Sequence, residues 1–493
     1  MRRNRTKPKQ QRIRSFFPDL DAGIDDGYGL GQNEDDSGLL FTRPKLSAFP
    51  TDTAEIRLSL LQKKDKRTAV FANPRFFSLE LQRTPSPFRR VALLDYSMSK
   101  YEFRNVIESL KTNTSVRFIK LYCPADDADD TVAPAIASLL SANSNLQGLH
   151  ITSDHSLHLK SISVLVQALR DNTSLRSLKI FQDGMQSKDV APLFELFKSQ
   201  PHLTSISLRS SFFDASLGPM LCCAQSLRRI ALPGCPIGDA LVDLFRSLKN
   251  NQTLTCLNLS CTDATFEAYQ ELAEMLKINR TVQHLNFSRN PISVFSMEEP
   301  IQFADALSEC TLTRLFLARC EFSDTMMTHI LKAVTLNSFI GVLDLSSNPL
   351  TSLVDATRIL SDLLRVNSTL QGLSLRATKL LPNELSQIAN DLCINTTLHF
   401  LDVSWNCFSP ATVDSFVRTM RTNSSLTELA SDDTIREMIR PALQLNKHNH
   451  LKHALLFDLL LPTCGDLILN LGVDLPASVP QPTCSGSNFQ ISL

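Results

Sequence analysis

Apolar and polar positions repeat along most of the chain with a period of 28 to 30 residues. Segments such as NTSLRSLKI (172–180), NQTLTCLNL (251–259) and NSTLQGLSL (367–375) share the template N-x-[ST]-[LV]-x-x-L-x-apolar. Only the intervals 203–227 and 227–254 are shorter. The first apolar position of the template falls at Phe88, Val116, Leu146, Leu175, Leu203, Leu227, Leu254, Val282, Leu312, Ile340, Leu370, Leu398 and Leu426. Such regularity indicates an array of similar structural units.

Each unit combines a strand pattern with a helix pattern. The x-L-x-L stretch alternates, which predicts a short strand with its leucines facing a core. The next dozen residues have helical spacing, and residues 355–367 place one apolar stripe at Ile359, Leu360, Leu363, Leu364 and Val366. We expect Asn367 to end this helix by entering the left-handed region. Because neither element can bury its apolar face alone, we predict a curved solenoid with a parallel sheet on the concave side and helices outside.

This pattern resembles the ribonuclease-inhibitor-like class of leucine-rich repeat proteins. The resemblance covers residues 88–430 and implies an α/β fold, the leucine-rich repeat horseshoe. It says little about function, because that family includes inhibitors, GTPase activators, immune sensors and scaffolds. Around the array we expect a disordered tail at 1–45, an N-terminal cap or linker at 46–87, a helical C-terminal cap at 431–462 and a second tail at 463–493.

Composition disfavours several classes of protein. Fifty basic and fifty acidic side chains balance, so the bulk charge favours neither nucleic acid nor a membrane. The fifteen glycines form no Walker or dinucleotide fingerprint, and the twelve cysteines form no CxxC or Cys/His metal spacing. The start lacks a secretory signal, and no apolar run has membrane-spanning length. We therefore expect an intracellular protein, cytoplasmic or nuclear, with reduced cysteines and with neither cofactor nor metal.

Side chains at the third, fifth and seventh positions of L-x-x-L-x-L-x are expected to point away from the core on the concave side. In the first half of the array these are Arg90, Phe118, Lys120, Tyr122, His150, Lys179, Phe181, Arg209 and Arg229. In the second half they are Asn258, His284, Asn286, Arg314, Phe316, Asp344, Arg376, Phe400, Asp402 and Glu428. Aromatic groups among bases are typical of interfaces, so we predict that the first set binds a protein partner. Two alternatives stay open: the rings stack on one another as structure, or the surface holds single-stranded nucleic acid, which the neutral array disfavours.

No nucleophile, base and orienting group recur in a known catalytic motif, so we predict a non-enzymatic protein. Asp344 and Asp402 lie two repeats apart and are expected to belong to a solvated face. His284 beside Asn286 is expected to be a contact residue rather than a ligand. A GTPase activator of the leucine-rich repeat kind would share this fold, but the acidic C-terminal tail of that class is missing, since residues 463–493 contain only two acids.

The N-terminal tail separates its charges. Seven bases come first, at Arg2, Arg3, Arg5, Lys7, Lys9, Arg12 and Arg14. Seven acids follow with no base between them, at Asp19, Asp21, Asp25, Asp26, Glu34, Asp35 and Asp36. A basic run of this kind is typical of a nuclear-import or nucleic-acid patch, or of a solvated tail.

Inside this tail, QQRIRSFF (10–17) resembles the PIP-box, the peptide motif that binds the replication sliding clamp, proliferating-cell nuclear antigen (PCNA). The motif is Q-x-x-[ILM]-x-x-[FY]-[FY], and Gln10, Ile13, Phe16 and Phe17 occupy its four specified positions. One tight helical turn places the three apolar side chains on one side, at i, i+3 and i+4. The resemblance implies that they form an apolar plug, that the glutamine fills a polar pocket and that flanking bases meet an acidic clamp surface. The alternative is that the three side chains pack back on the N-terminal edge of the solenoid.

A second short motif, RTPSPFRR (83–90), resembles a site for cyclin-dependent kinases, with Ser86 and the nearby Thr84 as possible phosphorylation sites. The sequence as a whole predicts a non-enzymatic scaffold that binds a protein on its concave face and docks on a sliding clamp through residues 10–17. A signalling or cytoskeletal adaptor that makes no use of the tail motif is the first alternative, and a GTPase activator is the second.

Overall fold

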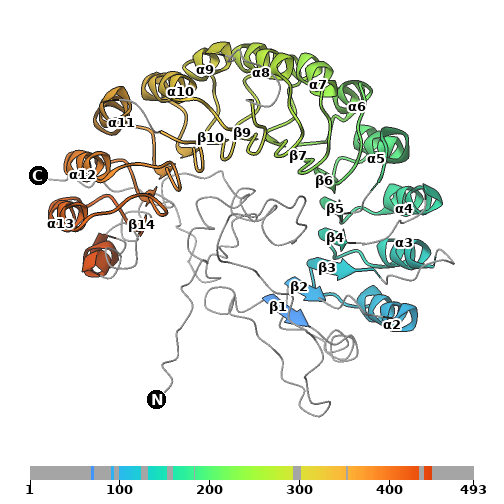
Figure 1. The fold of residues 1–493 in the computed structure, drawn as a ribbon. Coiled ribbons are helices and arrows are strands. Elements are labelled where there is room, and N and C mark those ends of the chain that lie inside the picture. Colours follow the sequence, from blue (N-terminus) through green and yellow to red (C-terminus); the bar gives the residue numbers. More distant parts are fainter. Residues whose placement is uncertain are drawn as a thin grey trace, which may run out of the picture.

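The repeats form one horseshoe-shaped array with strands along the inside of the curve and helices along the outside (Figure 1). The computed structural model describes residues 68–71, 90–93, 99–123, 131–152, 159–181, 184–292, 301–350, 354–431 and 438–446. The predicted α/β solenoid is confirmed.

Within the described part of the chain, fourteen strands form one sheet in which each strand pairs in parallel with the next along the sequence. The strands are β1 (Thr68–Phe71), β2 (Arg90–Leu93), β3 (Phe118–Tyr122), β4 (Gly148–Thr152), β5 (Ser177–Phe181), β6 (Ser205–Arg209), β7 (Arg229–Ala231), β8 (Cys256–Asn258), β9 (His284–Asn286), β10 (Arg314–Phe316), β11 (Val342–Asp344), β12 (Gly372–Ser374), β13 (Phe400–Asp402) and β14 (Glu428–Ala430).

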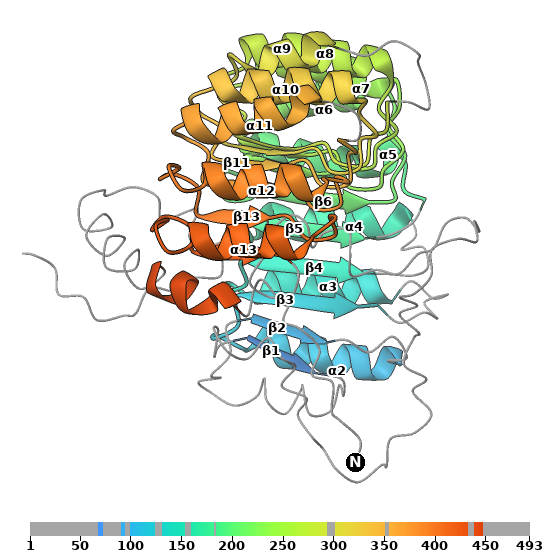
Figure 2. The ribbon, with the colours of Figure 1, turned by 60° about the vertical axis from the view of Figure 1, so that its left-hand side comes forward.

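The helices stack side by side in one outer layer (Figure 2). They are α2 (Lys100–Lys111), α3 (Val132–Ala142), α4 (Leu159–Asp171), α5 (Ser187–Ser199), α6 (Leu217–Cys223), α7 (Ala240–Leu248), α8 (Phe266–Ile278), α9 (Ile301–Leu307), α10 (Asp324–Leu336), α11 (Val354–Val366), α12 (Pro382–Asp391) and α13 (Pro410–Thr419). In α11 the predicted stripe is buried from Ile359 to Leu364, but Val366 is exposed. Two residues after Leu364 the helix has turned by about 200°, which carries Val366 to the solvent side.

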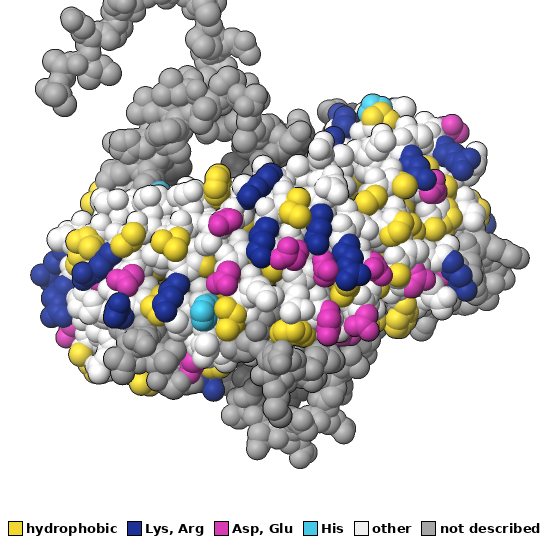
Figure 3. Space-filling view, turned by 90° about the horizontal axis from the view of Figure 1, so that it is seen from above, with side chains coloured by type: hydrophobic (Ala, Val, Ile, Leu, Met, Phe, Trp, Pro, Cys, Tyr) yellow, Lys and Arg dark blue, Asp and Glu magenta, His cyan; other side chains and the backbone are white. Residues whose placement is uncertain are grey.

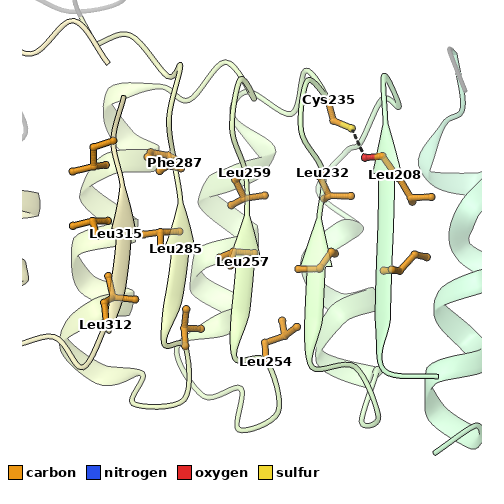
Figure 4. Close-up of a cluster of buried hydrophobic side chains, with 14 of the residues drawn as sticks. Leu208, Leu232, Cys235, Leu254, Leu257, Leu259, Leu285, Phe287, Leu312 and Leu315 are labelled. Carbon is orange, nitrogen blue, oxygen red and sulfur yellow. Dashed lines mark hydrogen bonds between the residues drawn. The ribbon is translucent and has the colours of Figure 1, made fainter. Parts of the chain in front are cut away.

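The core lies between the sheet and the helices. The first apolar position of the template is buried in every repeat from Val116 to Leu426. Figure 4 shows Leu257, Leu285 and Leu315 at one height on neighbouring strands, as the strand register requires. Each leucine therefore packs on its counterparts in the repeats before and after, which makes the core continuous along the array.

Cysteines at repeat positions belong to this core. Cys235 and Cys320 are wholly buried and form no disulfide. The Cys235 thiol donates to the carbonyl of Leu208 at 3.6 Å (Figure 4). Burial raises the pKa of each thiol to about 12, so both stay protonated at neutral pH. They act as small buried hydrophobes, as the sequence predicts.

The asparagine of the template has a different role from the one expected of Asn367. Asn367 has no positive φ, and its counterpart Asn337 has φ −72° and ψ 135°, so the left-handed expectation is wrong. The Nδ2 of Asn367 donates to the carbonyls of Val334 (2.9 Å) and Asn337 (3.1 Å) in the preceding repeat. Its Oδ1 accepts from the backbone N–H groups of Thr369 (2.9 Å) and Leu370 (2.8 Å). The side chain thus joins two adjacent turns, and similar bonds recur at Asn143, Asn172, Asn279, Asn337, Asn395 and Asn423.

We expect Asn367→Ala to destabilise the array by about 2–4 kcal/mol, because buried N–H and C=O groups lose their partners. Asn390→Ala, on an exposed residue of α12, is the matched control and should change stability by less than about 0.5 kcal/mol. Urea unfolding of the two variants checks this, and equal midpoints would contradict the role of the asparagine.

The sheet begins before residue 88, the first residue of the predicted array. Strand β1 lies inside the expected cap at 46–87, and residues 438–446 are helical inside the expected cap at 431–462. The tails at 1–45 and 463–493 lie outside the described residues. The motif residues Gln10, Ile13, Phe16 and Phe17 and the phosphorylation candidates Thr84 and Ser86 also lie outside them.

Candidate functional site: the concave face

The strand register sorts the predicted concave residues into three rows that run across the sheet. In the first row Arg90 pairs with Phe118, and in the second Lys120, His150 and Lys179 are consecutive. The third row holds Tyr122, Thr152, Phe181 and Arg209. In the strands whose side chains the structure describes, from β3 on, alternate residues are buried in the core, so the intervening side chains face the concave side.

Phe118 lies over a position of β4 that has no side chain. A Cβ placed on Gly148, its partner in β4, would lie 2.4 Å from Cδ1 of the Phe118 ring. The ring therefore lies across the backbone of the next strand and is half-buried there. Gly148 leaves room for this aromatic group on the concave surface.

Phe181 forms a second aromatic site together with its neighbours in adjacent strands. Its ring meets His150 edge-on, with ring centroids 4.5 Å apart, and the Arg209 guanidinium lies 5.9 Å from its centroid. Burial, Lys120 and Lys179 lower the pKa of His150 to about 2, so the imidazole is neutral at physiological pH. The aromatic contact is thus between Phe181 and a neutral histidine, and the ring remains half-buried.

Four residues follow one another in the first row of β7 to β10: Arg229, Cys256, His284 and Arg314. The Cys256 Sγ lies 3.1 Å from His284 Nδ1. Burial and the two arginines lower the pKa of His284 to about 4. Sequence reasoning missed Cys256, although it occupies the third position of its repeat. The pair has a nucleophile and a base, but strands β1–β10 supply no carboxylate to orient the imidazole.

The carboxylates Asp344 and Asp402 differ from the expectation of a solvated face, which is wrong because both side chains are buried. Asp344 Oδ1 accepts the backbone N–H of Ser346 at 2.9 Å, and Asp402 Oδ1 accepts that of Ser404 at 2.9 Å. Each aspartate caps the turn after its strand, as an Asx residue does. Burial raises the pKa of both groups, that of Asp344 to about 6.

Two asparagines have the same capping role. The Oδ1 atoms of Asn258 and Asn286 accept from the N–H groups two residues on, each at 3.1 Å. From β8 to β13 the second row consists of Asn258, Asn286, Phe316, Asp344, Ser374 and Asp402. Phe316 and Phe400 also face this side and are buried, outside the continuous core between sheet and helices.

An exposed tryptophan lies at the rim of the acidic end. Trp405, in the turn after β13, is 68% exposed and has a φ of 61°. The guanidinium of Arg376 lies 5.4 Å from the centre of its ring. The sequence template did not include this position, and the only signal was the rarity of the residue, since the chain has a single Trp.

Charge divides the sheet in two. Strands β1–β10 contain no Asp or Glu, and their Lys and Arg residues are Arg90, Lys120, Lys179, Arg209, Arg229 and Arg314. We call the five of these on β3–β10, Lys120, Lys179, Arg209, Arg229 and Arg314, the basic strip. We call Asp344, Asp402 and Glu428, on β11, β13 and β14, the acidic end.

The outer face is different, because charges of both signs are interspersed over the helices (Figure 3). Glu271 in α8 pairs with Arg246 at 3.0 Å and with Lys249 at 2.9 Å. Lys277 pairs with Glu274 at 2.8 Å. A shallow pocket of about 440 Å³ beside α9 and α10 is lined by both signs as well, among them Lys277, Asp305 and Lys332. Charges of both signs thus alternate on the outer face, whereas the strands carry them in separate blocks.

Among the described residues, no group of His, Cys, Asp and Glu is arranged to hold a metal ion. No described helix is both long enough and apolar enough to cross a membrane.

Residues 395–413 match the family described as Leucine Rich repeat. The chain is a leucine-rich repeat solenoid. This solenoid is 25% identical over 332 residues to the ribonuclease inhibitor of Mus musculus, a match covering 66% of each chain. It is 27% identical over 201 residues to the centrosomal protein of 78 kDa of the same organism, covering 34% of this chain and 25% of that protein. The solenoid thus spans less than two thirds of either relative.

Two solved structures are similar to this chain at low sequence identity. A chain of the Rad7 and Elc1 complex of yeast has a TM-score of 0.46 and 15% identity, covering 73% of this chain and 89% of that one. An internalin of Listeria monocytogenes has a TM-score of 0.35 and 15% identity, covering 66% and 88%.

Proposed function

We propose that the protein is a non-enzymatic scaffold that binds an acidic protein segment on the concave side of β3–β10. The observation that carries this proposal is the basic strip, together with the half-buried rings of Phe118 and Phe181 beside it. A surface of one charge sign attracts the opposite sign over its whole length, and aromatic groups supply the apolar contact. The mouse relative is named as an inhibitor of ribonuclease, which is itself a protein.

Binding rather than catalysis suits the arrangement of the titratable groups. His150 and His284 are neutral at physiological pH because burial and neighbouring cations lower their pKa values. The carboxylates of Asp344 and Asp402 hold turns by hydrogen bonds to the backbone. These groups shape and charge a surface, and none of them forms a complete acid–base set.

Affinity purification of the full chain tests this proposal. Changing Phe118 and Phe181 to Ser, with Lys179→Gln, should remove a protein that the wild type retains, while the melting temperature changes little because these side chains face away from the core. The matched control changes Leu336 and Phe339 to Ser, with Lys188→Gln, at exposed positions outside the basic strip. Retention of the same proteins by both variants would contradict the concave site.

Docking on a replication sliding clamp is a second candidate function, supported by the four motif positions Gln10, Ile13, Phe16 and Phe17. Burying three apolar side chains stabilises a complex by roughly 1.5–3 kcal/mol each before ordering costs, which suffices for micromolar binding of a short peptide. On this proposal the array recruits its partner to the clamp.

A further inference from the structure

The N-terminal tail and the concave face carry the same two blocks of charge in complementary order. Starting at β1 and moving along the sheet, one meets the basic strip on β3–β10 and then the acidic end on β11–β14. Starting at β1 and moving back along the chain, one meets the seven acids of residues 19–36 and then the seven bases of residues 2–14. If the tail lies along the sheet in this direction, its acids face the basic strip and its bases face the acidic end.

We propose that the tail is an intramolecular ligand of the concave face, with residues 19–36 on the basic strip and residues 10–17 on the acidic end. The occupant is a segment of this chain, and the surface it covers is the one that the proposed function assigns to an external partner. This inference therefore rests on that function for the location of the site and goes beyond it by naming a competing ligand.

The lengths of the segments permit this contact. Neighbouring strands lie about 4.8 Å apart, so the seven steps from β3 to β10 span about 34 Å. Residues 19–36 can extend to about 60 Å, and the 31 residues from 37 to 67 that link them to β1 can reach about 100 Å. Tethering on such a linker keeps the acidic run at roughly millimolar effective concentration, so weak contacts suffice for high occupancy.

The acidic end suits the motif residues chemically. Val342, Gly372 and Phe400 are consecutive in the first row, so apolar residues lie together there, beside Phe316 of the second row. On this proposal Phe16 and Phe17 pack at this end of the sheet, whereas the sequence alternative placed them at the N-terminal edge of the array. Asp344 and Asp402 are buried in their turns, and Glu428 is the part-exposed carboxylate of this end. Arg12 or Arg14 beside the rings would lie near Glu428 on this proposal.

Docking of the tail on the concave face excludes both the external partner and the clamp. While residues 19–36 cover the basic strip, an external acidic segment is excluded from it. While residues 10–17 lie on the acidic end, their rings are not presented to a clamp. Release of the tail would therefore free both surfaces together.

The test is a titration of a labelled synthetic peptide of residues 18–37 into full-length proteins. In the neutral-tail variant all seven acids of residues 19–36 become Asn or Gln, so its own tail no longer competes. We expect this variant to bind the peptide at least ten-fold more tightly than the wild type does. Adding Lys120→Gln, Lys179→Gln and Arg229→Gln should remove that binding. Adding Lys188→Gln, Lys332→Gln and Arg421→Gln, which removes equal charge from exposed positions off the concave face, should leave it unchanged.

Equal affinity of the peptide for the wild type and the neutral-tail variant would overturn the proposal, as would no binding to either. A neutral-tail variant that ignores the peptide but retains the cellular partner refutes the tail contact alone. If the cellular partner is retained equally after Phe118 and Phe181 are changed to Ser and Lys179 to Gln, the proposed function is refuted instead. Melting temperatures of all variants verify that the array stays folded.

Discussion

We expect Leu373→Asp to unfold the repeat array. Leu373 lies in β12, is fully buried and pairs in register with Leu343 and Leu401. The aspartate removes a buried leucine, worth about 2–5 kcal/mol, and places an unpaired carboxylate in a continuous apolar layer. The expected loss exceeds about 5 kcal/mol, a large part of the stability of an ordinary domain. Leu257→Asp in β8 should act in the same way.

Leu336→Asp is the matched control, because this leucine at the end of α10 is 76% exposed. Circular dichroism melts should show a cooperative transition for this variant close to that of the wild type. Leu373→Asp should show little ordered signal at room temperature. If the two variants melt alike, the layer of strand leucines is not the core of the protein.

We expect a synthetic peptide of residues 5–21 to bind the sliding clamp at micromolar strength or better. Changing Phe16 and Phe17 to Ala should weaken this binding by at least about 3 kcal/mol, because both rings lose their apolar pocket. Changing Arg12 and Arg14 to Ala should cost less and should mainly remove the dependence on salt, because charges at the rim are screened. Titration calorimetry measures all three peptides.

The double Phe change in the full chain separates clamp binding from a structural role. A tail whose rings bind only the clamp predicts an unchanged melting temperature. A lowered melting temperature without clamp binding by the peptide would mean that the rings serve the solenoid instead. That outcome would refute clamp binding, and it would agree with the proposed contact between the tail and the acidic end.

Periodicity was sufficient to predict the sheet and its core. The template placed Leu257, Leu285 and Leu315 in one buried layer, and the structure shows them in register. This works because alternation fixes which face of a strand is apolar, and the constant period fixes which residues of successive strands are neighbours.

Contacts between repeats were harder to predict, because they depend on atoms about 28 residues apart. The bonds from Asn367 to Val334 and Asn337 cross one repeat, and the contact between Cys256 and His284 does so as well. A template shows that an asparagine recurs, but it does not show what its side chain binds. The burial of Asp344 was missed because a carboxylate in an outward position usually meets water, and here its backbone hydrogen bond fixes it in a turn.

Photo-cross-linking from two positions in one repeat tests the central claim, which is that the concave strip contacts a protein partner. A photoreactive residue replaces Lys179 on β5 or Lys188 on α5, both of which are exposed, in the neutral-tail full-length protein. The account predicts adducts with another protein from position 179 and few or none from position 188. Adducts from position 188 alone, or in equal yield from both positions, would contradict it.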